Sequence, residues 1–226
     1  MSGPDAPARN RVDPLGDVVA APGRGDLMGN RGRLHDGAGT RGVRRHHVGR
    51  AWITCLLEFR DRRVRQWDPS HYTPLFFLDE ALALAAGHRP CAECRRADFG
   101  RFRDLVAASH RTTHLPAPGL DRLLHDERWD PQRRTRRLHA YAWGDVPDGT
   151  YVLLGSGPAV VTNGGLLPWL PDNTYAATPV ERPRGGIATV ITPPSSVEAL
   201  RAGFEVRVGR RPGGPQASPS SSSEKA

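Results

Sequence analysis

Two cysteines separated by two residues, Cys91 and Cys94, constrain this chain more than any other feature of its sequence. They follow an alanine-rich stretch in the segment FFLDEALALAAGHRPCAEC, residues 76–94. Two thiolates at this spacing can bind one zinc ion, because the short turn brings the sulfurs to roughly 3.5–4 Å, the edge of a tetrahedron with Zn–S of about 2.3 Å. The pair therefore predicts a metal site that residues from elsewhere in the chain complete.

The same spacing at the start of a helix also occurs in redox dithiols, because the helix dipole lowers the pKa of a thiol there. Two features favour zinc. Pro90 precedes the pair instead of lying within it, and no βαβ pattern surrounds the pair. The chain has three cysteines, and an odd number in a reducing compartment argues against a disulfide framework.

The composition indicates one or two small domains. Apolar residues make up 38% of the 226 residues, which suffices for a core, while 21 prolines and 25 glycines predict many turns. Residues 1–26 lack apolar periodicity and residues 211–226 are rich in Pro, Gly and Ser, so we expect disorder at both ends. No segment approaches the ~20 apolar residues of a membrane span or has the core of a secretory signal. We therefore expect a cytoplasmic protein without membrane contact.

Local patterns predict an α+β fold whose first part, residues 27–130, is a zinc-binding module. Residues 51–59 are rich in β-forming residues, and a charged turn followed by residues 64–67 completes a predicted β-hairpin. A helix is expected to begin at Asp79 and to end at Gly87. A second helix is predicted after the cysteines, because the spacing of Phe99, Phe102 and Val106 places them on one apolar face.

The second part, residues 131–210, has a different pattern. Short β-forming segments alternate with Gly-rich turns, which predicts strands over 151–154, 159–162, 166–170 and 187–192. We expect a small β-rich unit here, and it carries no motif with an assignable chemistry.

Residues 76–94 resemble the N-terminal zinc domain of the Ada methylphosphotriester repair proteins. In that family a Phe-Phe pair, an Ala-rich helix and Gly-x-Arg-Pro-Cys-x-x-Cys provide the second pair of zinc thiolates, and the resemblance extends over about residues 50–98. The family's first pair is Cys-x3-Cys, and one of these cysteines also accepts the methyl group. Those two positions fall on Trp67 and His71 here. Because tryptophan neither binds zinc nor accepts a methyl group, the resemblance implies a zinc module without methyl-acceptor activity.

The resemblance and the predicted hairpin together indicate a ligand set. His71 is an acceptable replacement for a cysteine, since imidazole nitrogen also binds zinc. In the hairpin, Cys55 would face about Asp68, and cross-strand neighbours lie about 4.5–5.5 Å apart at Cβ. Cys55 also fits a small buried apolar residue. We expect a Zn²⁺ ion bound by Cys55, His71, Cys91 and Cys94, with His35 and His88 as alternative fourth ligands.

The charge balance fits a nucleic-acid partner. The formal net charge is +8 and the pI is near 10.3, and nearly all of the basic residues are arginines. Cationic surfaces release counterions from phosphates, although a solvated basic surface fits the same composition. We expect Arg89, Arg95 and Arg96, beside the metal turn, to contact phosphates of DNA or RNA. His46 and His47 are expected to be solvated loop residues.

The sequence thus predicts a zinc-binding, nucleic-acid-associated protein with a structural zinc site and no methyl-acceptor activity. Two alternatives remain. One is a zinc-thiolate repair methyltransferase acting through Cys55. The other is a module for interaction with a protein partner, in which zinc only stabilises the fold.

Overall fold

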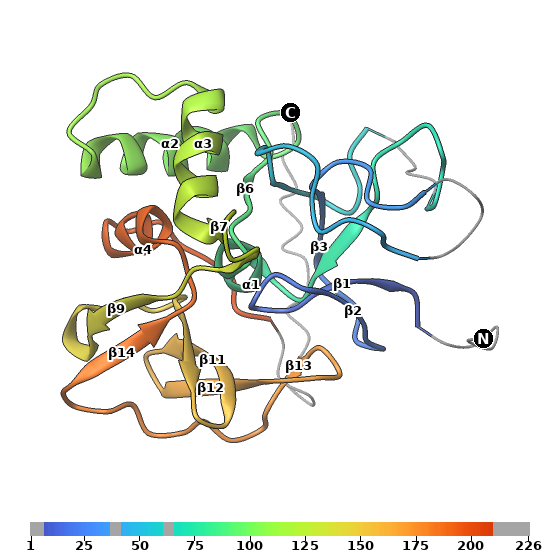
Figure 1. Ribbon diagram of the computed structural model, residues 1–226. Coiled ribbons are helices and arrows are strands. Elements are labelled where there is room, and N and C mark those ends of the chain that lie inside the picture. Colours follow the sequence, from blue (N-terminus) through green and yellow to red (C-terminus); the bar gives the residue numbers. More distant parts are fainter. Residues whose placement is uncertain (1–6, 37–41, 61–65, 210–226) are drawn as a thin grey trace, which may run out of the picture.

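The computed structural model describes residues 7–36, 42–60 and 66–209. Within these residues the chain forms an α+β fold, as predicted, with four α-helices and two six-stranded sheets (Figure 1). A separate short hairpin, β7 (Trp129–Asp130) and β8 (Thr135–Arg136), connects the two parts of the chain.

The first sheet has the strand order β2-β1-β5-β3-β4-β6. Its strands are β1 (Arg9–Val12), β2 (Val18–Ala20), β3 (Leu27–Asn30), β4 (Ile53–Cys55), β5 (Leu75–Phe77) and β6 (Arg89–Pro90). The prediction of disorder over residues 1–26 is therefore wrong for residues 7–26, because β1 pairs in parallel with β5 and buries Val12 in the core. The other predicted disordered residues, 1–6 and 211–226, lie outside the described ones.

The second sheet is formed mostly by an antiparallel meander, with the order β13-β12-β11-β10-β14-β9. Its strands are β9 (His139–Ala142), β10 (Tyr151–Leu154), β11 (Gly157–Thr162), β12 (Gly165–Leu170), β13 (Thr174–Tyr175) and β14 (Ile187–Val190). This sheet confirms the β-rich character that the Gly-rich turns predicted for the second part. A 3₁₀ turn, Trp143–Asp145, follows β9.

The helices are α1 (Glu80–Ala85), α2 (Arg96–Ser109), α3 (Ala117–Arg128) and α4 (Pro194–Arg201). The carboxylate of Asp79 accepts a hydrogen bond from the Leu82 amide and so caps α1. Gly87 ends α1 with φ +85°, as its type predicted, and a β-carbon there would lie 2.3 Å from Cδ of Arg128. No helix in these ranges is long and apolar enough to cross a membrane.

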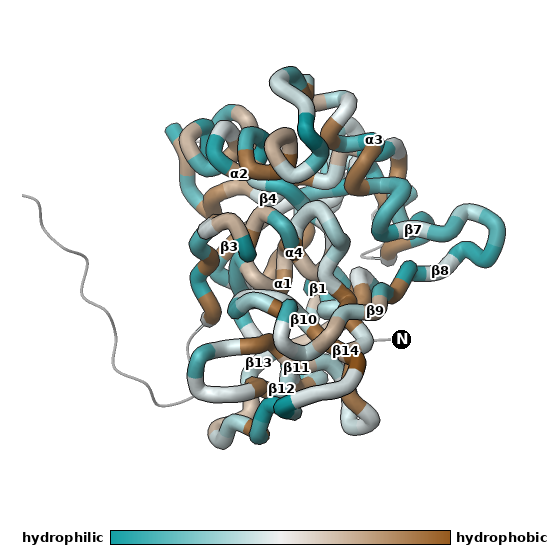
Figure 2. Tube along the Cα trace, turned by 90° about the vertical axis from the view of Figure 1, so that its left-hand side faces the viewer, coloured by the Kyte–Doolittle hydropathy of each residue, from teal (hydrophilic) through white to brown (hydrophobic). Residues whose placement is uncertain are grey.

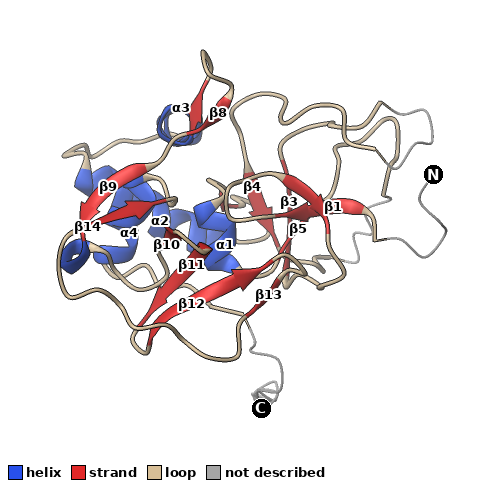
Figure 3. Ribbon diagram, turned by 60° about the horizontal axis from the view of Figure 1, so that its bottom comes forward, coloured by secondary structure: helices blue, strands red, loops and turns tan. Residues whose placement is uncertain are grey.

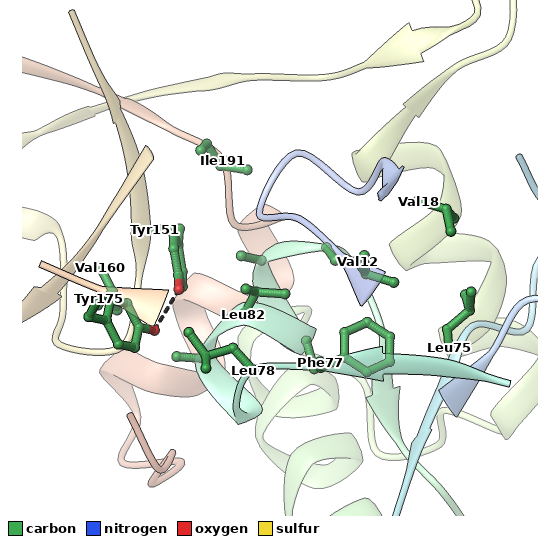
Figure 4. Packing of buried hydrophobic residues seen from close by; sticks show 14 of the residues in the cluster. Val12, Val18, Leu75, Phe77, Leu78, Leu82, Tyr151, Val160, Tyr175 and Ile191 are labelled. Atoms are coloured by element: carbon green, nitrogen blue, oxygen red, sulfur yellow. Dashed lines mark hydrogen bonds between the residues drawn. The ribbon is translucent and has the colours of Figure 1, made fainter. Parts of the chain in front are cut away.

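The two sheets lie on either side of α1, whose six residues are all buried (Figure 3). One hydrophobic cluster joins Val12, Phe77 and Leu82 from the first part to Tyr151 and Tyr175 from the second (Figure 4). The Tyr175 hydroxyl donates to Oδ2 of Asp79 at 2.7 Å and lies 2.5 Å from the Tyr151 hydroxyl. The predicted units 27–130 and 131–210 therefore share a core, and the boundary between them falls in the β7–β8 hairpin.

Candidate metal centre

Three cysteines from two distant segments lie together. The sulfurs of Cys55, Cys91 and Cys94 are all within 4.8 Å of one another. Cys55 ends β4, whereas the other two flank the turn between β6 and α2. β4 and β6 pair in parallel, with Thr54 opposite Pro90, and the Cys91 amide donates to the Thr54 carbonyl at 2.9 Å. Main-chain pairing thus places Cys55 beside Cys91.

The turn between β6 and α2 orients the second and third sulfurs. The Glu93 amide points at Sγ of Cys91, 3.4 Å away, and the Arg95 amide donates to the Cys91 carbonyl at 3.2 Å. A backbone hydrogen bond from Leu56 reaches Cys94. Amide groups directed at sulfur favour the thiolate form, which is the form that binds metals.

The three thiols shift one another's pKa values. A hydrogen bond from the Cys55 thiol lowers the pKa of Cys91, and the backbone bonds act in the same direction. That hydrogen bond to Cys91, together with burial, raises the pKa of Cys55, and burial raises the pKa of Cys94. Without a cation the cluster therefore favours one thiolate, at Cys91, that accepts a hydrogen bond from the thiol of Cys55. A cation among the sulfurs would favour three thiolates.

A small cavity of about 30 Å³ adjoins the sulfurs, which is close to the volume of one water molecule. Its wall is largely apolar and includes Met28, Leu56, Leu57 and Phe59. In the ranges described, no His, Asp or Glu ligand atom joins the three sulfurs within the same 4.8 Å. The cluster therefore offers three protein ligands and room for one small further ligand.

His71, the predicted fourth ligand, is exposed and is not part of the sulfur cluster. Its Nδ1 atom lies 2.9 Å from Oγ of Ser70 and 3.3 Å from a carboxylate oxygen of Asp68. The predicted hairpin placed it incorrectly. Cys55 lies opposite Met28 of β3 rather than Asp68, Trp67 lies in a turn, and residues 61–65 are outside the described part.

The two alternative histidines are buried in other surroundings. His35 contacts Oγ1 of Thr73 at 2.6 Å and the Asp68 carbonyl at 2.9 Å. His88 accepts a hydrogen bond from Nε of Arg31 at 3.2 Å, and its ring contacts Phe77. Neither belongs to the cysteine cluster.

Two of the three arginines predicted to contact phosphate are buried in ion pairs. Arg89 binds both carboxylate oxygens of Asp121, at 2.8 and 3.0 Å. Arg95 pairs with Glu80 on α1 and with Asp98 on α2. The ion pair of Arg89 joins α3 to the metal turn, and the ion pairs of Arg95 join α1 and α2 to it. Arg96 is the one of the three that is exposed.

A second group of side chains, in which basic residues pack against tryptophans, could not be predicted from the sequence. Arg31 and Arg128 are buried against Trp52, with their guanidinium carbons 4.1 and 4.0 Å from its ring centroids. His46 stacks on Trp129 at 4.6 Å and an interplanar angle of 19°, so His46 is packed rather than solvated. The run Arg44-Arg45-His46-His47 was the one feature of the sequence that could have indicated this group. No local pattern, however, predicts that such a run packs against distant tryptophans.

No protein-family model matches this chain, and no curated protein or solved structure shows a significant match to it. The fold and the site therefore define its class by themselves. It is an α+β protein with three clustered cysteines that could bind a metal ion.

Proposed function

We propose that this protein binds one zinc ion through Cys55, Cys91 and Cys94 and works in association with DNA or RNA. The observation that carries the zinc assignment is the approach of three sulfurs from β4 and the β6–α2 turn within 4.8 Å. Soft thiolate ligands favour zinc over magnesium or calcium, which prefer oxygen. The resemblance of residues 76–94 to the Ada zinc domain supports the same metal.

The proposed role of the ion is structural. Bound zinc supplies positive charge that stabilises three neighbouring thiolates. The protein supplies the geometry, because β4 and β6 are held in register by backbone hydrogen bonds on either side of the Thr54–Pro90 pair. Zinc at this position would join the first sheet to the start of α2.

The proposed association with nucleic acid rests on charge. The net charge is +8, and the exposed side chains of the basic stretch 132–137 add a local concentration of arginine. Such surfaces bind phosphate backbones through counterion release, so we expect binding to weaken steeply with salt.

Transfer of a methyl group to Cys55 is a second candidate, favoured by the cavity beside the sulfurs and by the partial exposure of Cys55. In this reaction Sγ attacks the methyl carbon of a methylphosphotriester, a thioether forms, and the phosphodiester leaves. Mass spectrometry after incubation with methylphosphotriester DNA tests it. A Cys55 peptide heavier by one CH₂ supports transfer, and an unmodified peptide excludes it.

Elemental analysis of the purified protein tests the zinc proposal. We expect one zinc per chain, lost in Cys91→Ser and Cys94→Ser and strongly reduced in Cys55→Ser. His71→Ala is the matched control, since it removes a predicted ligand outside the cluster and should retain full metal content. Protein expressed with added zinc but isolated without metal would contradict the proposal, as would full metal content in Cys55→Ser/Cys91→Ser.

A further inference from the structure

A second cavity, of about 920 Å³, is lined by basic side chains and shares no lining residue with the cysteine cavity. Its wall has one carboxylate, Asp17, and four guanidiniums, from Arg44, Arg45, Arg134 and Arg136. We call this cavity the arginine pocket. The β7–β8 hairpin that provides Arg134 and Arg136 projects from the molecule and is largely hydrophilic (Figure 2). The pocket is within the size range of small-ligand sites, about 300–1,000 Å³.

Two further arginines are buried behind this wall. Arg31 and Arg128 have 0% and 1% of their surface exposed, and no carboxylate lies within ion-pair distance of either in the described ranges. Arg31 adjoins the pocket, because its Nη1 atom is 3.3 Å from Nε2 of His46, a lining residue. Buried arginine is ordinarily paired with an anion. The positive charge here is compensated by Trp52, by main-chain carbonyls and, beyond ion-pair distance, by Asp13 and Asp17 near Arg31.

Several guanidinium donors in this group have no partner. Nη1 of Arg31 donates to the Gly16 carbonyl at 2.7 Å, but its buried Nη2 donates to nothing in the described chain. The buried Nε atoms of Arg128 and Arg136 are also without acceptors. A β-carbon on Gly16 would lie 3.8 Å from both Nη2 of Arg31 and Nη1 of Arg136, so these two guanidiniums converge below the Gly16 turn. Buried donors are nearly always satisfied, which indicates that an acceptor is missing.

The charges around the pocket repel one another. Burial and the neighbouring Arg136 lower the pKa of Arg31 to about 9, and burial lowers the pKa of Arg136 to about 9. Burial and Arg31 lower the pKa of His46 to about 3, so its imidazole is neutral near pH 7. The carboxyl of Asp13 nearby has its pKa raised to about 6, chiefly by burial. An anion in the pocket would therefore relieve repulsion that Asp13 and Asp17 offset only in part.

We propose that the arginine pocket binds the phosphoryl group of an organic phosphate, with Arg45, Arg134 and Arg136 as donors. A phosphoryl group fits better than a carboxylate, because its oxygens can accept from several guanidiniums at once. The pocket is larger than a single anion, and the stacked rings of His46 and Trp129 provide a flat wall for the remainder of the ligand. This inference is independent of the proposed zinc site, because the pocket involves neither the cysteines nor a metal. It deepens the proposed association with nucleic acid, on which it rests in part, because Arg134 and Arg136 belong to the basic stretch 132–137.

Calorimetric titration of the full chain tests the inference with three ligands: inorganic phosphate, adenosine monophosphate and a short single-stranded oligonucleotide. Adenosine is the uncharged control. Arg45 and Arg134 are exposed, so the double variant Arg45→Ala/Arg134→Ala should fold and bind phosphate at least roughly tenfold more weakly. Arg122→Ala is the matched control, since it removes an exposed arginine of α3 that neither lines the pocket nor belongs to the basic stretch 132–137.

The three ligands also separate the sources of the phosphoryl group. Tighter binding of the mononucleotide than of inorganic phosphate supports a small organic phosphate, and tighter binding of the oligonucleotide supports a nucleic-acid backbone. No binding of any of the three, equal binding of adenosine, or an equal loss in Arg122→Ala would overturn the inference. Zinc content measured on the same samples distinguishes this outcome from a failure of the metal proposal.

Discussion

The cysteine cluster and the arginine pocket each hold ionisable groups of like charge close together. The charge is negative in the cluster and positive in the pocket. In each, the fold brings together groups that carry like charge when ionised: three thiols in one case, and the guanidiniums of Arg31, Arg128 and Arg136 in the other. No cationic side chain of the described residues joins the three sulfurs in the cluster, and the carboxylates near the arginines, such as Asp13 and Asp17, offset their repulsion only in part. A cation at the first site and an anion at the second would each remove a like-charge repulsion.

The two regions differ in how they tolerate the absence of a ligand. A thiol can keep its proton, and the thiol of Cys55 keeps its own while it donates a hydrogen bond to the sulfur of Cys91. Arginine does not readily give up its proton, so its charge must be compensated by other means. The compensation is the face of Trp52 and a set of main-chain carbonyls. The cysteine cluster can therefore reduce its charge to that of a single thiolate, whereas the arginines remain charged.

Removal of the metal from the cysteine cluster is expected to have the largest effect on the free energy of unfolding. It tests whether a cation offsets the charge of the three thiolates. If zinc is bound at a free concentration roughly 1,000-fold above its Kd, a chelator should lower the free energy of unfolding by about 4 kcal/mol. Urea unfolding with and without chelator measures the difference. Cys91→Ser should show no response to chelator, and the same urea midpoint for the wild type in both conditions would contradict the prediction.

Substitution of a paired and an unpaired buried arginine sharpens the comparison. Arg89→Met leaves the buried carboxylate of Asp121 alone and should cost about 3 kcal/mol of unfolding free energy. Arg31→Met loses a carbonyl hydrogen bond and its contact with Trp52, but it also relieves repulsion, so the expected cost is about 1 kcal/mol.

Urea unfolding in phosphate-free buffer measures both costs. Arg89→Met/Asp121→Leu is the control, because removal of both charges should recover part of the loss. Equal costs for Arg31→Met and Arg89→Met would show that the two arginines are compensated to the same degree.

Asp79 is a buried carboxyl group that accepts hydrogen bonds only from neutral donors, so its charge has no ion-pair partner within the described chain. Burial raises the pKa of Asp79 to about 6, above the value of about 4 for an exposed aspartate. Between these values the folded state holds a proton that the unfolded state has lost. The resulting stabilisation is present below about pH 4 and is lost as the pH rises through about 6, a change of about 3 kcal/mol.

Urea unfolding at several pH values across this range, with Asp79→Asn as the comparison, isolates the contribution of Asp79. Asp13, whose pKa is shifted in the same direction, is retained in both proteins and therefore cancels in the difference. Parallel pH profiles for the wild type and Asp79→Asn would show that Asp79 is ionised in the folded protein.

The smallest effect is expected for the exposed arginines of the β7–β8 turn. Arg133→Ala and Arg134→Ala should each change the unfolding free energy by less than about 0.5 kcal/mol, because both side chains are exposed. Thermal unfolding checks this. A larger loss for Arg134→Ala would mean that it supports the hairpin, so its effect on phosphate binding could not be assigned to ligand contact alone.

Much of the fold could be predicted because its signals are local. The Gly-rich turns predicted the meander of the second part, Gly87 predicted the end of α1, and the apolar face of Phe99, Phe102 and Val106 predicted α2. The strands at residues 9–20 could not be predicted, since they have little apolar periodicity. They form because β5 provides a partner for β1 and the core covers Val12.

The candidate site was predictable to the same extent. The Cys-x-x-Cys turn is a local structure, and its two sulfurs lie where the spacing put them. Cys55 was placed near them by a hairpin that the described residues do not show, yet it reaches them through β6. His71 was misplaced with that hairpin. The partner of a strand depends on the whole sheet. The register inferred from one predicted turn therefore determined the expected positions of both Cys55 and His71.

By itself, the sequence determined the ligand types, the geometry of the Cys91–Cys94 turn and an excess of arginine, because these depend on residue identity and on neighbours along the chain. Only the tertiary structure decided which arginines are paired. Arg89 and Arg95 form ion pairs with carboxylates from α1, α2 and α3. Arg31, Arg128 and Arg136 instead lie close enough to lower the pKa of Arg128 by charge repulsion. The energy of a charge depends on its burial and on the charges around it, and both are set by segments that meet only in the folded chain.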